Sequence, residues 1–152
     1  MGAMDAITLL KEDHRKVKKM LGDLEDTTER AVKTREELYG KLKFELTVHE
    51  QIEEALLYPT LKEHDTTKEI ALEAYEEHNV VDLIMGEIDQ TPFDDETWGA
   101  KLKVMKENLE HHMEEEEGEM FKKARQVLDE AELESLGARM EEMKRQAKAE
   151  AA

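Results

Sequence analysis

The sequence predicts an all-α protein, an antiparallel up-down-up-down four-helix bundle with an additional C-terminal helix. Apolar residues recur at steps of three and four along most of the 152 residues, which is the spacing of an amphipathic helix, and no segment alternates like a strand. Charged residues make up 40% of the chain and aromatic residues only 5%, and the abundant Leu, Met, Ala, Glu and Lys favour helix. Short polar segments separate the helices, so consecutive helices should run antiparallel.

Capping residues and a proline delimit the first two helices. Asp5 is a suitable N-cap for the first helix, whose apolar stripe fades in a polar stretch near residue 30. Thr34 and Glu37 form a capping box, which predicts a second helix that begins near residue 35. Pro59 should kink or end this helix, with frayed helix to about Lys62.

The later helices carry similar signals. Thr66 and Glu69 form a capping box for the third helix, and Asp94 can cap the fourth after a Thr-Pro-Phe loop. Asp129 caps a shorter fifth helix. The tail from Lys144 is mostly Ala, Lys and Glu and should fray.

Length and charge bound the domain organisation and the partners. We expect a bundle domain over residues 5–128 and an appended C-terminal helix and tail over residues 129–152. A net charge of −17 disfavours nucleic acid and anionic membranes as partners. The chain has no cysteine, which excludes disulfides and thiolate metal ligands and suits a cytoplasmic protein. No apolar run approaches a membrane span or a signal sequence.

A histidine interrupts the apolar stripe of each of the four bundle helices. One such histidine alone is usually structural, but one on every helix indicates a shared cause. At a rise of about 1.5 Å per residue, all four fall at one level of an antiparallel bundle. They are His14, His49, His78 and His112.

Two of these histidines have a glutamate four residues later, one turn along the same helix face. The pairs are His49 with Glu53 and His112 with Glu116, each within a His-x-x-x-Glu-Glu segment. Four imidazoles and two carboxylates cost too much to bury without compensation. Coordination of two metal ions supplies it, and nitrogen and oxygen ligands fit iron but also Mn, Zn or Co.

Several neighbouring residues have a less specific interpretation. His111 also has a glutamate four residues on, Glu115, but it aligns with a mostly polar face, so we expect it to face solvent. We expect Glu54 and Glu117 beside the ligands or on the surface. Tyr75, one turn before His78, can approach the site and donate a hydrogen bond, but packing is the role that we expect for it.

Taken together, these segments resemble the hemerythrin-like HHE cation-binding domain over residues 5 to about 125. The resemblance implies a non-haem site with two iron ions (Fe²⁺/Fe³⁺) that share an oxo or hydroxo bridge. It also implies that Glu53 and Glu116 bridge the ions and that the four histidines ligate them. The matching segments are Asp13-His14-Arg15, His49-x-x-x-Glu53-Glu54 running into Leu57-Tyr58-Pro59, Glu77-His78, and His112-x-x-x-Glu116-Glu117 running into Met120-Phe121.

The chain departs from the oxygen-carrying hemerythrins at one ligand. Those proteins have a further histidine one turn before the position of His78, where this chain has Ala74. Glu50, directly after His49, is similar to an additional ligand in the hemerythrin-like domain of an iron-sensing ubiquitin ligase subunit. Glu50 is either a seventh metal ligand that replaces the absent imidazole or a solvated residue on the flank of an acidic helix, and the sequence supports both interpretations equally.

The resemblance extends to bacterial hemerythrin-like proteins with a similar appended helix, and it implies a function. The function that we favour is catalase-like decomposition of H₂O₂, an oxidoreductase activity. The alternative is binding or sensing of O₂, NO or iron without turnover, and a third hypothesis is a structural bundle without metal. We expect a monomer or weak homo-oligomer whose partner is a small molecule.

Overall fold

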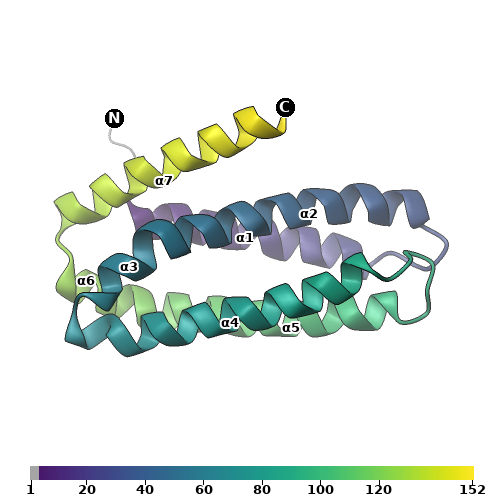
Figure 1. The fold of residues 1–152 in the computed structure, drawn as a ribbon, viewed down its shortest axis with the longest axis horizontal. Coiled ribbons are helices and arrows are strands. Elements are labelled where there is room, and N and C mark those ends of the chain that lie inside the picture. The colour runs from purple at the N-terminus through teal and green to yellow at the C-terminus, as the bar shows by residue number, and fades with distance from the viewer. Residues whose placement is uncertain (1–3) are drawn as a thin grey trace.

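The computed structural model describes residues 4–152 and is built from helices joined by short connections (Figure 1). It confirms the predicted all-α class, and no strand occurs among the described residues. In chain order the elements are α1 (Ala6–Glu25), α2 (Val32–Ile52), the π-helical turn η1 (Glu53–Leu57), α3 (Tyr58–Lys62), α4 (Asp65–Asp89), α5 (Trp98–Glu115), the π-helical turn η2 (Glu116–Met120), α6 (Phe121–Val127) and α7 (Glu130–Ala151).

These elements form four antiparallel rods and one additional helix. The second rod is the continuous run α2–η1–α3, and the fourth is α5–η2–α6. The C-terminal helix α7 packs on α1 and α2 and lies on the side of the bundle away from α4 and α5 (Figure 1). None of the described helices combines the length and the apolar character that a membrane span requires.

Two of the predicted helix caps are present. The Asp5 side chain accepts a hydrogen bond from the backbone N–H of Thr8 at 2.8 Å. Asp129 and Glu132 form a complete capping box at the start of α7. The first helix ends at Glu25, earlier than the fading stripe suggested.

The other three predicted caps are wrong. Helix α2 begins at Val32, before Thr34, and α4 begins at Asp65, before Thr66. At the start of α5 it is Asp95, not Asp94, that accepts from the N–H of Thr97, at 2.7 Å. At the start of α2 a tertiary contact outweighs the local capping signal.

Arg35 provides such a contact at the start of α2. Its buried guanidinium donates to the side chain and the carbonyl of Thr27 and to the carbonyl of Phe93. The guanidinium also lies over the ring of Trp98, 4.5 Å from its centre. One side chain therefore joins the α1–α2 loop to the α4–α5 loop and anchors the first turn of α2.

The predicted fraying of the tail is also wrong. Helix α7 continues to Ala151, and its Lys144 forms an ion pair with the buried Asp13 of α1. Gly137 allows the close approach, because a Cβ there would lie 2.1 Å from the carbonyl oxygen of Met4. The additional helix is thus a packed part of the described structure.

The apolar core is divided into two clusters. On α1 the change falls between Leu10 and Val17, and on α4 between Ala74 and Val81. A histidine occupies each of these gaps, His14 on α1 and His78 on α4. The histidines and their carboxylates therefore form a polar layer that separates the two apolar ends of the bundle.

Candidate metal centre

The structure brings together six of the seven predicted ligands. All six are at most 6% exposed, and each of the four rods contributes at least one of them. They are His14, His49, Glu53, His78, His112 and Glu116.

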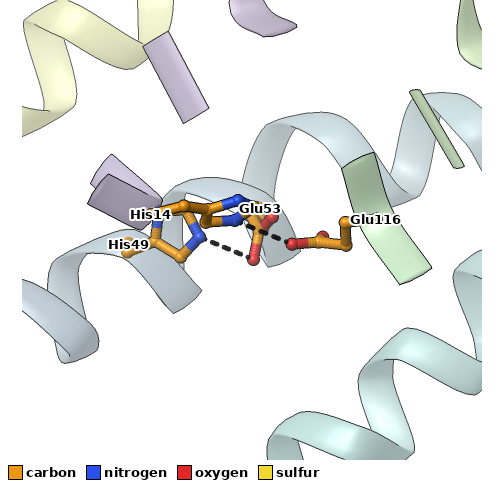
Figure 2. Close-up of side chains that lie close together, drawn as sticks. All are labelled: His14, His49, Glu53 and Glu116. Atoms are coloured by element: carbon orange, nitrogen blue, oxygen red, sulfur yellow. Dashed lines mark hydrogen bonds and ion pairs between the residues drawn. The ribbon is translucent and has the colours of Figure 1, made fainter. Parts of the chain in front are cut away.

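Their donor atoms form two groups that share a carboxylate. The first group is His14, His49, Glu53 and Glu116, whose donor atoms lie within 4.8 Å of one another (Figure 2). In this group Nε2 of His49 is 3.2 Å from Oε1 of Glu53, and Nε2 of His14 is 3.1 Å from Oε1 of Glu116. The second group is Glu53, His78 and His112.

Each of the two glutamates contacts one histidine on either side. Oε1 of Glu53 is also 3.1 Å from Nε2 of His78. Oε1 of Glu116 is also 3.3 Å from Nε2 of His112. The carboxylates therefore stand between two pairs of imidazoles, the arrangement that a bridge between two cations requires.

A second set of carboxylates holds the outward nitrogen of each of the four inner histidines. In each case Nδ1 is within 3.0 Å of a carboxylate oxygen that comes from another rod. Such a partner fixes the ring orientation and leaves Nε2 free to face inward. The pairs form a closed circuit around the bundle: Asp13 with His49, Glu54 with His78, Glu77 with His112, and Glu117 with His14.

No role was predicted from the sequence for two of these outer carboxylates. Asp13 and Glu77 directly precede a histidine, but each serves the histidine of a different helix. Glu54 and Glu117 lie beside the inner residues, as expected. The sequence signal that could have identified these two carboxylates is the acidic residue directly before His14 and directly before His78.

The π-helical turns bring in a further residue, Tyr58. The N–H of Tyr58 donates to the carbonyl of Glu53, five residues earlier. A π-turn returns residue i+5 to the face of residue i, whereas α-helical spacing would turn it away. The Tyr58 hydroxyl therefore lies in the centre, where it donates to Oε2 of Glu116 at 2.7 Å and lies 3.1 Å from Oε1 of Glu53.

The equivalent turn η2 places Phe121 in the same way, five residues after Glu116. Its ring stacks on His14, with 6.1 Å between centres and an interplanar angle of 11°. By contrast, the hydroxyl of Tyr75 donates to the carbonyl of Glu54 at 3.3 Å and contacts no histidine nitrogen. The tyrosine that approaches the inner carboxylates is Tyr58.

The electrostatics of the polar layer suit cations. Burial opposes charge on His49, but Glu53 and Asp13 outweigh it and raise the pKa of His49 to about 10. The pKa of His78 rises to about 9, because its interaction with Glu53 outweighs burial. Burial also opposes ionisation of Glu116, yet His112 and His14 hold its pKa well below the usual range.

Two inward ligand atoms have no hydrogen-bond partner among the described residues. They are Nε2 of His49 and Oε2 of Glu53, both buried. The His49 nitrogen lies close to Glu53 but is not aligned for a hydrogen bond. A buried polar atom without a hydrogen-bond partner costs folding free energy, and a bound metal ion would remove this cost by coordinating both atoms.

Comparison with known proteins agrees with this geometry. The family model described as the hemerythrin HHE cation-binding domain matches residues 5–124. The chain belongs to the hemerythrin HHE cation-binding domain family. The crystal structure of a hemerythrin HHE cation-binding domain-containing protein from Mycobacterium kansasii is similar, with a TM-score of 0.85 and 28% identity over 96% of this chain and 89% of that one. No curated protein matched the chain.

In this HHE domain the seventh predicted ligand, Glu50, lies apart from the inner donors. Its Oε2 is 3.9 Å from Nδ1 of His78, the nitrogen that faces away from Glu53. Glu50 is 7% exposed, so it is not a freely solvated flank residue. Burial and the nearby Asp82 raise the pKa of Glu50 to about 8.

His111 lies outside the centre, as expected from its polar face. Its side chain is 67% exposed, and its Nε2 is 3.2 Å from Oε1 of Glu115 on the same helix. The neighbouring His112 is buried, and its Nδ1 is 2.7 Å from Glu77. The apolar pattern of α5 therefore distinguished correctly between two adjacent histidines.

Proposed function

We propose that this HHE domain binds two iron ions and decomposes H₂O₂. His14 and His49 would hold one ion, His78 and His112 the other, and Glu53 and Glu116 would bridge them. The observation that carries the proposal is the pair of buried donor groups that share Glu53. Iron bound there would supply the change of oxidation state that disproportionation of H₂O₂ to water and O₂ requires.

Tyr58 supports an assignment different from a reversible O₂ carrier. Its oxygen is 3.2 Å from Nε2 of His78 and 3.5 Å from Nε2 of His112. It therefore presents a hydroxyl beside the second group, at a centre where Ala74 cannot supply an imidazole. The carboxylates of Glu53 and Glu116 are harder ligands than imidazole and favour more oxidised iron.

The Tyr58 hydroxyl also holds a proton between the two inner carboxylates. Burial and the charges of Glu116 and Glu53 raise the pKa of Tyr58 well above its ordinary value, so the group remains protonated without metal. Peroxide chemistry needs a proton source at the reacting oxygens. Tyr58 is the residue that we assign to this task.

The second candidate is binding or sensing of O₂ or NO without turnover. The burial of all six proposed ligands is compatible with both candidates, because O₂, NO and H₂O₂ are all small enough for such a centre. The two candidates share the metal site and differ in what the bound ligand undergoes.

One preparation tests both candidates. Metal content, the visible spectrum after exposure to O₂, and O₂ release from added H₂O₂ are measured on the same sample. Two irons with rapid O₂ release support the enzyme, and two irons with a reversible O₂ adduct and no turnover support the carrier or sensor. Metal content that stays well below one ion per chain after reconstitution contradicts both.

Three variants test the ligand assignment. Glu53→Ala and Glu116→Ala should each remove both ions, because each carboxylate faces both pairs of histidines. His111→Ala is the control and should retain both, since His111 is exposed. Metal loss in His111→Ala would show that the centre is assigned to the wrong face of α5.

A further inference from the structure

An acidic pocket opens beside Glu50 and Glu54, the two glutamates that lie nearest to the outward nitrogen of His78. It has a volume of about 630 Å³ and opens between α2, η1, α4 and α7. Three of its lining residues, Glu50, Glu54 and Asp82, carry carboxylates, and none is basic. The pocket is therefore suited to a cation.

Two residues of this lining, Glu50 and Glu54, belong to a second group of possible metal ligands. Donor atoms of Glu50, Glu54 and His78 lie within 4.8 Å of one another. Oε2 of Glu54 is 2.8 Å from Nδ1 of His78, and Oε2 of Glu50 is 3.9 Å from the same nitrogen. The opposite nitrogen of this imidazole, Nε2, faces Glu53 in the centre.

Glu50 supplies an independent indication of a ligand. The residue is 7% exposed, and its Oε2 has no hydrogen-bond partner among the described residues. A buried carboxyl oxygen without a partner is costly, and a cation that displaces the carboxyl proton is a partner that removes the cost. The unpartnered atom belongs to a residue of the pocket lining and lies 3.9 Å from Nδ1 of His78.

We propose that Glu50, Glu54 and Asp82 form a transit site that captures a hydrated divalent cation and delivers it to the centre. The inference rests on the proposed function, because it supposes that the centre takes up metal. Carboxylate oxygens bind divalent ions that keep part of their water shell. A cleft lined by charge of one sign concentrates counter-ions and raises the rate of association. Glu50 then acts in metal loading and is not a seventh ligand.

The rate of metal loading tests the proposal. Metal-free protein is mixed anaerobically with Fe²⁺, and in a parallel experiment with Co²⁺, while absorbance follows uptake. Asp82→Asn should slow loading about threefold or more at low ionic strength, and salt should narrow the difference. The final number of ions per chain should match the wild type, because Asp82 contacts no histidine.

A matched control on the same helix is Glu87→Gln. Glu87 is exposed and outside the pocket lining, and its substitution changes the net charge by the same amount. This variant should load at the wild-type rate. Loading of Asp82→Asn at the wild-type rate, or equal slowing in Glu87→Gln, overturns the transit site.

Glu50→Gln separates transit from ligation. A transit role predicts slower loading with unchanged final content and unchanged resistance to a chelator. Lower content or faster loss to the chelator would make Glu50 a ligand and overturn the assignment. A wild-type chain that takes up neither ion is a different result, which contradicts the proposed function itself and the transit site with it.

Discussion

Lys144 connects the C-terminal helix to the centre through one buried carboxylate. Its Nζ pairs with Oδ1 of Asp13, while Oδ2 of Asp13 is 3.0 Å from Nδ1 of His49. Asp13 is 3% exposed. Although burial opposes ionisation, His49 and Lys144 together lower the pKa of Asp13 below its ordinary value. Lys144→Met removes one of the two cationic partners and keeps most of the apolar stem.

The structure sets the expected cost. A hydrogen bond to a charged group contributes about 1.5–3 kcal/mol, and breaking a fully buried ion pair costs about 3–5 kcal/mol. The Lys144 side chain is 17% exposed, so water can partly replace it, which places the expected loss near the lower range. We expect about 2 kcal/mol, which corresponds to about 4–8 °C in Tm for a chain of this size.

Thermal unfolding of metal-free protein, followed by circular dichroism, measures this loss. Arg145→Met is the control, because it removes the same charge from the next residue. Arg145 is 68% exposed and pairs only with Glu142 of its own helix, so its Tm should stay at the wild-type value. Equal Tm values for Lys144→Met and the wild type, or an equal fall in both variants, would refute the link between α7 and Asp13.

The remaining predictions concern Tyr58, pH and Gly137. Tyr58→Phe should reduce the rate of O₂ release from H₂O₂ at least tenfold while both irons stay bound, because loss of a proton donor usually lowers a reaction rate by a factor of about 10²–10⁴. Turnover at the wild-type rate would contradict the proposed role of Tyr58 as a proton donor. Because the pKa values of His49 and His78 are raised to about 10 and about 9, both rings are charged in metal-free protein at neutral pH. Coordination must displace these protons, so metal affinity should rise with pH up to about 9. Calorimetry in buffers of different ionisation enthalpy measures the protons that are released when the metal binds. An affinity that does not change with pH would contradict the prediction. Because the pKa values of His49 and His78 are higher in the folded protein than in the unfolded chain, the two charged rings stabilise metal-free protein, fully so below the unfolded histidine pKa of about 6.5. This stabilisation should be lost as the pH rises through the folded pKa values, and Tm should fall accordingly. Gly137→Ala should lower Tm, because the added Cβ would meet the backbone of Met4 and Asp5, and an unchanged Tm would show that α7 does not approach α1 so closely.

Helix periodicity was sufficient to predict the bundle and its six inner residues. A side chain's direction from a helix depends on the geometry of that helix alone, so spacing placed His112 inward and His111 outward. The same reasoning placed Glu53 and Glu116 one turn beyond their histidines. Their convergence in the structure follows from antiparallel rods of similar length.

Periodicity failed where the local geometry changes. Tyr58 lies five residues after Glu53, and α-helical spacing alone would direct it away from that face. The π-turn places Tyr58 in the centre, and nothing in the segment Glu-Glu-Ala-Leu-Leu predicts a π-turn. The cap expected at Thr34 failed for a related reason, because the contacts of Arg35 anchor the start of α2.

The sequence by itself determined the four histidines, their two glutamates and the helices that carry them, because each of these is a matter of spacing within one helix. Only the tertiary structure decided which carboxylate supports which histidine. Asp13 meets His49 across 36 positions, and Lys144 meets Asp13 across 131. These pairings depend on how the packed helices are rotated and staggered. The same packing places Glu50 near the outward nitrogen of His78 and away from the inner carboxylate of Glu53.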